Sequence, residues 1–174
     1  MSPGAARQVT AGRTRRTRPN TFLRDIELSL PLQLLKAREA AMARFRPMLR
    51  GHGLTEQQWR VIRVLATGET LDGQALARRS FLLAPSLTRI LQFFEAQDTV
   101  KRSAHASDQR RVLFTLTSKG RRLFDTVAPD AEALYAAIAS EFGAAKLATL
   151  YDLLAEFSAA LGADGDEQTG RAGR

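Results

Sequence analysis

The sequence predicts a mainly α-helical protein built on a winged helix-turn-helix, an α/β winged helix, with a helical dimerisation region. Three observations predict this fold. Residues 82–97 carry apolar side chains at helical spacing, and residues 99–117 read as two β-prone runs around a basic turn. Long stripes of apolar residues at helical spacing lie on both sides of this central stretch.

The helix expected after Leu83 has one apolar and one polar face. Pro85 suits its first turn, because the N–H that proline lacks would have no intrahelical partner there. The apolar positions are Leu87, Ile90, Leu91 and Phe94. The polar positions are Ser86, Thr88, Arg89 and Gln92. Such side chains read base edges or bind phosphates, although a merely solvated face is the commoner meaning for one helix alone.

A hairpin with a basic tip is expected next. Residues 99–100 and 112–117 are β-prone, the second run with alternating polarity. The basic side chains around the turn are Lys101, Arg102, Arg110 and Arg111. An arginine-tipped hairpin directly after a candidate recognition helix has the order of a wing, so Arg110 and Arg111 are candidate DNA contacts. Arg110 is expected to reach the minor groove, with Asp108 holding a neighbouring arginine in place.

Signals of helix and strand boundaries fill in the rest of the module. Thr55 and Gln58 form the pattern of a capping box that opens a helix running to about residue 67. Leu71 is expected to form a minimal strand against the wing. Asp72 is expected to cap a short helix through Arg79, the first half of the helix-turn-helix.

The two flanking regions are expected to be long helices that pair with a second copy. Residues 30–49 form the first, residues 118–142 the second, and the last follows Gly143. The buried candidates of the first helix are Leu34, Leu35, Met42, Phe45 and Leu49. Together these stripes exceed what one small module covers, which predicts a two-fold homodimer. The dimerisation helices are then about 21–50 and 118–161, and the DNA-binding module is about 54–117.

Composition narrows the class of protein. The chain has 174 residues, no cysteine and two histidines, which suits one domain and disfavours disulfides, thiol chemistry and a zinc site. It lacks an apolar run of about 18 residues, a glycine-rich phosphate loop and a G-x-S-x-G motif. We therefore expect a cytoplasmic protein that does not enter membranes, is not an enzyme, and has no catalytic residues, metal or cofactor.

The positive charge is concentrated rather than spread. The formal net charge is +8, and residues 78–122 hold ten basic against three acidic side chains. This is the pattern of a surface that binds double-stranded DNA. Residues 1–20 hold five arginines without an acid and are expected to be a disordered basic arm; residues 162–174 are expected to be a disordered tail. A sequence-indifferent architectural nucleic-acid-binding protein is the alternative that charge alone allows.

These motifs resemble a known family. DGQALARRSFLLAPSLTRILQFFE followed by SDQRRVLFTLTSKG resembles the MarR family of transcription regulators, whose wing has an Asp-x-Arg pair, a strand ending in Leu-Thr, and a glycine. QLLKAREAAMARFRPMLRGHGLTEQQWRVIRVL resembles its branch that responds to hydroxyphenylacetate and related hydroxylated aromatic acids. The resemblance implies a dimeric repressor that binds an inverted-repeat operator, with half-sites about 34 Å apart, and is released by a small aromatic carboxylate.

The resemblance also implies an effector site. Trp59 and Arg63 stand four residues apart on one helix, although a buried tryptophan near a surface arginine is the commoner meaning of that spacing. In the branch, a Trp and an Arg of this helix, a Tyr of the long fifth helix and a Ser from the other subunit touch the ligand. The matching residues here are Trp59, Arg63, Tyr135 and Ser29, with Arg38 and Phe45 as further lining. Arg63 would pair with the carboxylate and Trp59 would pack on the ring; hydroxynicotinate-type acids satisfy the same groups.

The chain departs from the branch on the DNA side. Ala84, Arg89 and Phe93 stand where relatives tend to have other residues, and Phe93 occupies a site where a phosphate-binding arginine is usual. The operator sequence of the relatives therefore does not transfer to this chain.

Overall fold

The computed structural model describes residues 26–104 and 111–162. The expected basic arm, most of the expected tail and the tip of the expected wing lie outside these residues. The chain divides into two compact units, Met1–Arg38 and Glu39–Arg174. The described part of the first unit begins with a 3₁₀ turn, Ile26–Leu28, and continues into α1 (Leu30–Gly51). Within it, Lys36 pairs with Glu27 at 2.9 Å.

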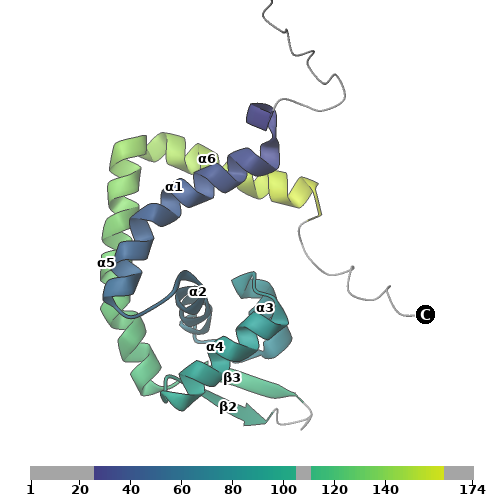
Figure 1. Ribbon diagram of the computed structural model, residues 1–174, viewed down its shortest axis with the longest axis vertical. Helices are drawn as coiled ribbons and strands as arrows, with labels where there is room; N and C mark the ends of the chain where they lie inside the picture. The colour runs from purple at the N-terminus through teal and green to yellow at the C-terminus, as the bar shows by residue number, and fades with distance from the viewer. Residues whose placement is uncertain (1–25, 105–110, 163–174) are drawn as a thin grey trace, which may run out of the picture. The chain divides into compact units, whose positions relative to one another are not determined.

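The helix-turn-helix of the second unit forms where the sequence predicts it. α2 (Glu56–Leu65), α3 (Gly73–Ser80) and α4 (Ala84–Ala96) gather beside the hairpin in Figure 1. Thr55 and Gln58 make both bonds of the capping box that begins α2. The Asp72 carboxylate accepts from the backbone N–H of Ala75 at 2.8 Å, which caps α3. The helices end within two residues of the predicted positions.

The wing is a three-stranded antiparallel sheet in the order β1-β3-β2. β2 (Val100–Ala104) and β3 (Val112–Leu116) pair along their full length, with Val100 opposite Leu116. β1 (Leu71–Asp72) is the predicted minimal strand, and Leu71 lies opposite Phe114. The alternation expected for β3 does not appear in its burial, because all five of its residues are half-buried.

Among the described residues, one apolar core joins the three short helices and the sheet to α1 and to the long helix of residues 118–142. The predicted stripe of α4 faces this core, and Phe94 is 1% exposed. The buried members contributed by α4 are Leu87, Ile90, Leu91 and Phe94. The polar face of α4 is therefore held outward by the burial of the opposite side.

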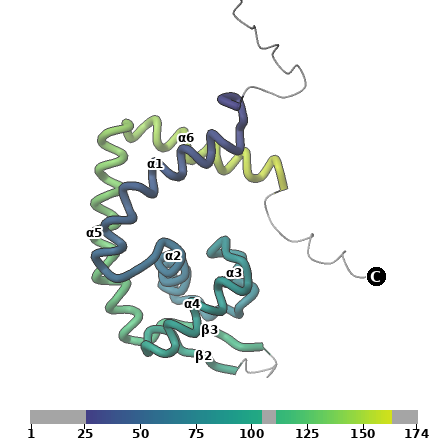
Figure 2. Tube along the Cα trace, in the orientation of Figure 1, coloured from purple at the N-terminus to yellow at the C-terminus, as the bar shows by residue number. Residues whose placement is uncertain are grey.

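The long helix α5 (Ser118–Phe142) leads from the base of the wing past α2 to the turn into α6 (Ala144–Ala160), as the trace in Figure 2 shows. The helix continues through Pro129, and Gly143 at φ +99° ends it. α6 buries none of its residues. Of the buried candidates of α1, Phe45 and Leu49 are buried in the single chain, whereas Leu34 is 37% and Leu35 52% exposed, so burial of these two against a second copy stays a prediction.

Candidate nucleic-acid interface and ligand site

The outer face of α4 presents the polar side chains that the sequence selects. Thr88, Arg89 and Gln92 are exposed and Ser86 is half-exposed. The Thr88 hydroxyl donates to the carbonyl of Ala84 at 2.9 Å, so its methyl group is the part turned to the outside. The face thus offers a guanidinium, an amide and two small side chains in a row, a set suited to base edges and phosphates.

The wing adds cations beside this face. Lys101 and Arg102 of β2 are exposed, and the Arg102 Nε lies 3.7 Å from a carboxylate oxygen of Glu95 on α4. Arg111, just ahead of β3, forms an ion pair with Asp72. The predicted wing residues Asp108 and Arg110 lie outside the described residues.

Asp72 therefore has two structural partners. Its carboxylate caps α3 and also accepts from the Arg111 guanidinium. The backbone hydrogen bond from Ala75, followed by that from Arg111, lowers the pKa of Asp72 below its ordinary value. Its side chain is only 15% exposed, so the carboxylate is a fixed charge between the helix-turn-helix and the wing.

Trp59 is buried between α2 and α5. It is 5% exposed and its indole stacks on the ring of Phe124, with centroids 5.6 Å apart and planes 18° from parallel. Its Nε1 is buried and has no hydrogen-bond acceptor among the described residues. An unmet buried donor costs about 1–3 kcal/mol, which makes this atom a point where an added acceptor would be favourable.

Arg63 lies on the same helix and reaches α5. Its guanidinium donates to the hydroxyl of Tyr135 at 2.8 Å and lies 5.7 Å from the centroid of that ring. Tyr135 also packs on Phe45 of α1, with ring centroids 4.8 Å apart. The guanidinium thus lies beside aromatic surface and bonds a hydroxyl rather than a carboxylate, an arrangement that suits an aromatic acid.

The structure brings together part of the predicted effector set. Arg63 and Tyr135 are in contact, Phe45 lies against Tyr135, and Trp59 is one turn along α2. Ser29 and Arg38 belong to the first unit, and their contribution remains a prediction.

Phe124, the residue on which the Trp59 indole stacks, was not predicted from the sequence. Phe124 stands eleven residues before Tyr135, which is about three turns of helix and places both on one face of α5. That spacing was the available signal. The ion pair of Arg111 with Asp72 joins residues 39 positions apart and has no comparable signal in the sequence.

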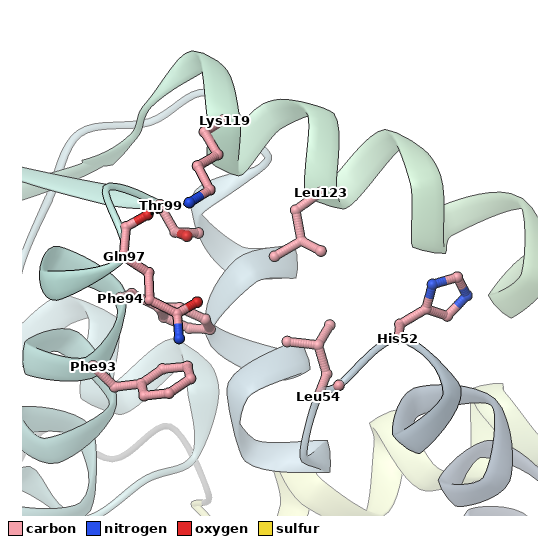
Figure 3. A pocket seen from close by; sticks show the side chains of 9 residues that line it. His52, Leu54, Phe93, Phe94, Gln97, Thr99, Lys119 and Leu123 are labelled. Carbon is pink, nitrogen blue, oxygen red and sulfur yellow. Dashed lines mark hydrogen bonds between the residues drawn. The ribbon is translucent and has the colours of Figure 1, made fainter.

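A separate cavity of about 300 Å³ opens at the C-terminal end of α4 (Figure 3). Phe93 and Phe94 line one side, Leu123 of α5 the other, and the Lys119 ammonium donates to the carbonyl of Gln97 at 2.7 Å. None of the predicted effector residues lines this cavity.

In the part of the chain that the structure describes, no group of three or more histidine or acidic side chains is arranged to hold a metal ion. None of the described helices is both long and apolar enough to cross a membrane.

Comparison with known proteins matches this geometry to a family. A model of the MarR family matches residues 52–111, from the turn after α1 to the residue before β3. The HTH-type transcriptional regulator FarR of Neisseria gonorrhoeae is 44% identical over 130 residues, 75% of this chain and 89% of that protein. The homoprotocatechuate degradative operon repressor of Escherichia coli is 44% identical over 131 residues, 75% of this chain and 88% of that protein.

A solved structure shows the same likeness in three dimensions. The crystal structure of NadR in complex with 4-hydroxyphenylacetate is 41% identical, covers 78% of this chain and 96% of its own, and superposes with a TM-score of 0.69. The predicted winged helix-turn-helix is therefore confirmed, both as a fold and as a module for binding DNA. The chain belongs to the MarR family of transcriptional regulators.

Proposed function

We propose that this protein is a repressor that, as a homodimer, binds an inverted-repeat operator in the cytoplasm and is released by a small hydroxylated aromatic carboxylate. The contact of Arg63 with Tyr135 carries the effector half of the proposal. Hydroxyphenylacetate and hydroxynicotinate types of acid both fit its chemistry.

The charge at Arg63 supports a carboxylate ligand. Among the described residues, its guanidinium donates to the hydroxyl of Tyr135, and the arginine is exposed. A guanidinium can bind the two oxygens of a carboxylate through two parallel N–H donors. The single oxygen of a tyrosine hydroxyl cannot accept both of these hydrogen bonds in that geometry. An entering acid would therefore replace one weak acceptor with two charged ones.

The rings around Arg63 support an aromatic ligand. Two packed ring pairs lie here: Phe45 of α1 packs on Tyr135 of α5, and Trp59 of α2 packs on Phe124 of α5. The buried Nε1 of Trp59 lacks an acceptor, which a hydroxyl or carboxylate oxygen would supply. Because these rings already pack on one another, a ligand enters only by separating them.

That separation supplies the regulatory mechanism. α2 packs directly on α3, the first helix of the DNA-binding pair, and α5 begins at the base of the wing. A ligand bound between α2 and α5 would shift the DNA-binding modules of the two subunits relative to each other. Switches of this kind typically have coupling free energies of ~1–3 kcal/mol, about 5–150-fold in DNA affinity.

The names of the relatives agree with this chemistry. One relative is a homoprotocatechuate degradative operon repressor, and another was crystallised with 4-hydroxyphenylacetate. Homoprotocatechuate and 4-hydroxyphenylacetate are both hydroxylated arylacetates, the class of compound that the Arg63 site fits.

The exposed apolar face of α6 supports the dimer. Leu150 is 40%, Tyr151 55%, Leu153 57% and Leu154 38% exposed in the single chain. We expect a second copy of the chain to cover this face, because a two-fold operator requires two recognition helices held one helical turn of DNA apart. Light scattering after gel filtration should give the mass of a dimer; a monomer at micromolar concentration contradicts the proposal.

The effector is tested by operator binding measured with fluorescence anisotropy. The duplex is the DNA upstream of the protein's own gene, and a scrambled duplex of equal length controls for sequence-indifferent binding. Titration with 4-hydroxyphenylacetate, 3,4-dihydroxyphenylacetate and 6-hydroxynicotinate should weaken binding to the first duplex by about 5–150-fold.

Two matched variants locate the effector. Arg63→Ala should keep operator binding and lose the response, whereas Lys119→Ala, in the cavity of Figure 3, should keep the response. The reverse pattern would move the effector to the Lys119 cavity and contradict the assignment. A wild-type protein indifferent to all three acids contradicts the effector half and leaves DNA binding standing.

A further inference from the structure

The turn between α3 and α4 presents two large apolar side chains to solvent. Phe81 is 83% and Leu83 79% exposed, the highest values among the exposed large apolar residues of the described chain. Leu82 between them packs against the core instead. We call Phe81 and Leu83 the apolar tip. Single exposed apolar side chains are common on protein surfaces. Exposure alone therefore does not indicate a function for the apolar tip, whereas its backbone conformation and its surroundings do.

The backbone at Phe81 is held in an unfavourable conformation. Its φ of +51° and ψ of +50° are left-handed, a region where glycine and asparagine are the usual residues. A phenylalanine there gains no burial in return. Retaining a bulky side chain in a strained backbone conformation is typical of a functional position.

Hydrogen bonds fix the turn that carries the apolar tip. The Arg60 guanidinium donates to the carbonyls of Ser80 at 3.0 Å and Phe81 at 3.3 Å. The backbone N–H of Phe81 donates to Arg78, and that of Leu82 to Ala77. The ring of Phe81 therefore projects from a fixed base, so it has little backbone entropy to lose on contact with a partner.

The apolar tip lies inside the cationic DNA-binding surface. Leu83 is the N-cap of α4, and the first residues of a recognition helix are those that meet base edges. Arg78 and Arg79 precede the tip and Arg89 follows it by less than two helical turns, all three exposed. A polyanion is the partner that this charge selects.

We propose that the apolar tip is a specificity contact, in which Phe81 packs on the C5-methyl group of thymine in the major groove; this rests on the sequence-specific DNA binding proposed above. The thymine methyl is the apolar group that base pairs display in that groove. The apolar benzyl side chain of Phe81 has no favourable polar contact to make with a phosphate. The ring would therefore contribute to binding affinity only through contact with a particular base. Leu83 adds apolar surface beside it and excludes water.

The inference is tested by removing the methyl group from DNA. Wild-type protein selects a duplex from a random-sequence pool, and each thymine of the selected duplex is replaced in turn by deoxyuridine. At one thymine in each half-site, wild-type affinity should fall roughly fourfold, the equilibrium effect of one buried methyl group. Phe81→Ala should lower affinity for the thymine duplex and show no further loss with deoxyuridine at that position.

Two variants separate this contact from folding and from general hydrophobicity. Phe81→Gly suits the left-handed backbone, so its Tm should stay at or above the wild-type value while the thymine preference disappears. Phe93→Ala removes a different exposed ring, one that lies on α4 and is 40% exposed, and should retain the full deoxyuridine effect.

The outcomes are distinct. Independent, additive effects of Phe81→Ala and deoxyuridine at every thymine overturn the inference, as does an affinity loss equal on all duplexes. A change of oligomeric state in Phe81→Ala would make the apolar tip a protein contact and also overturn it. Each of these leaves selective, acid-responsive binding by the wild type intact, whereas failure of the pool to yield any preferred sequence overturns the proposed function itself.

Discussion

The Arg111 guanidinium pairs with the Asp72 carboxylate and so ties the start of β3 to the cap of α3. Asp72 also lies in β1, where its backbone is paired with Leu113. One side chain therefore connects the helix-turn-helix with the wing. Arg111, a predicted DNA contact, is engaged inside the protein in this structure.

The two roles of Asp72 separate in two substitutions. Asp72→Ala removes the α3 cap and the ion pair, and should lower the free energy of unfolding by about 1 kcal/mol or more. Asp72→Asn keeps a good capping residue and removes the charge, so its loss of stability should be smaller. Urea denaturation followed by circular dichroism gives both values.

The same Asp72→Asn variant tests what Arg111 does. With the tether removed, the wing is less well ordered, and operator affinity should fall by up to about fivefold, equivalent to about 1 kcal/mol. Anisotropy titration measures this. A rise in affinity would instead mean that Arg111, once released, binds phosphate, and that its tie to Asp72 restrains DNA binding.

Stability should depend on pH through Asp72. Its hydrogen bonds with Ala75 and Arg111 lower its pKa in the folded state, so the folded value lies below the unfolded value of about 3.9. The stabilisation is complete above the unfolded pKa and is lost as pH falls through the folded pKa. Denaturation curves of wild type and Asp72→Asn should differ at pH 7 and converge in acid; a constant difference would contradict this.

The contact of α5 with the turn between α4 and β2 leaves no room for a side chain at Gly120. A Cβ there would lie 2.2 Å from the carbonyl oxygen of Thr99, which also accepts from the backbone N–H of Thr117. Gly120→Ala should lower the free energy of unfolding by about 2–3 kcal/mol. Gly51→Ala is the control, because it meets nothing within 4 Å and should raise stability by about 0.5–1 kcal/mol.

Trp59 offers a direct signal for effector binding without DNA. It is the single tryptophan of the chain, and it is stacked on Phe124 beside the Arg63 site. A bound hydroxylated arylacetate should change its fluorescence in a saturable way. Arg63→Ala should shift the midpoint at least tenfold, about 1.4 kcal/mol, through the lost carboxylate contact. An unchanged midpoint would place the acid elsewhere.

Local signals explain why much of this fold is predictable. Several features are formed by residues close together in the sequence and can therefore be predicted from it directly. They are the capping box at Thr55, the cap at Asp72 and the apolar stripe from Leu87 to Phe94. Burial of Leu34 and Leu35 stays a prediction, because it depends on a second copy that would cover the surface left exposed in the single chain.

The effector site was predictable in residue type but not in contact. Arg63 and Trp59 share a helix, yet only packing decides that the guanidinium meets Tyr135 while the indole meets Phe124. Both partners lie on α5, more than sixty residues later. Resemblance to a family predicted Tyr135, whereas Phe124 was missed, although its helical spacing from Tyr135 places the two on one face of α5.

The amino-acid sequence alone determined the helices, the wing, the concentration of positive charge and the family, because periodicity, capping and charge are properties of neighbouring residues. The tertiary structure decided which side chains pair across the chain, including Arg111 with Asp72, Arg63 with Tyr135 and the exposure of Phe81. These depend on how helices pack and on what burial leaves outside, and neither is fixed until distant segments are brought together.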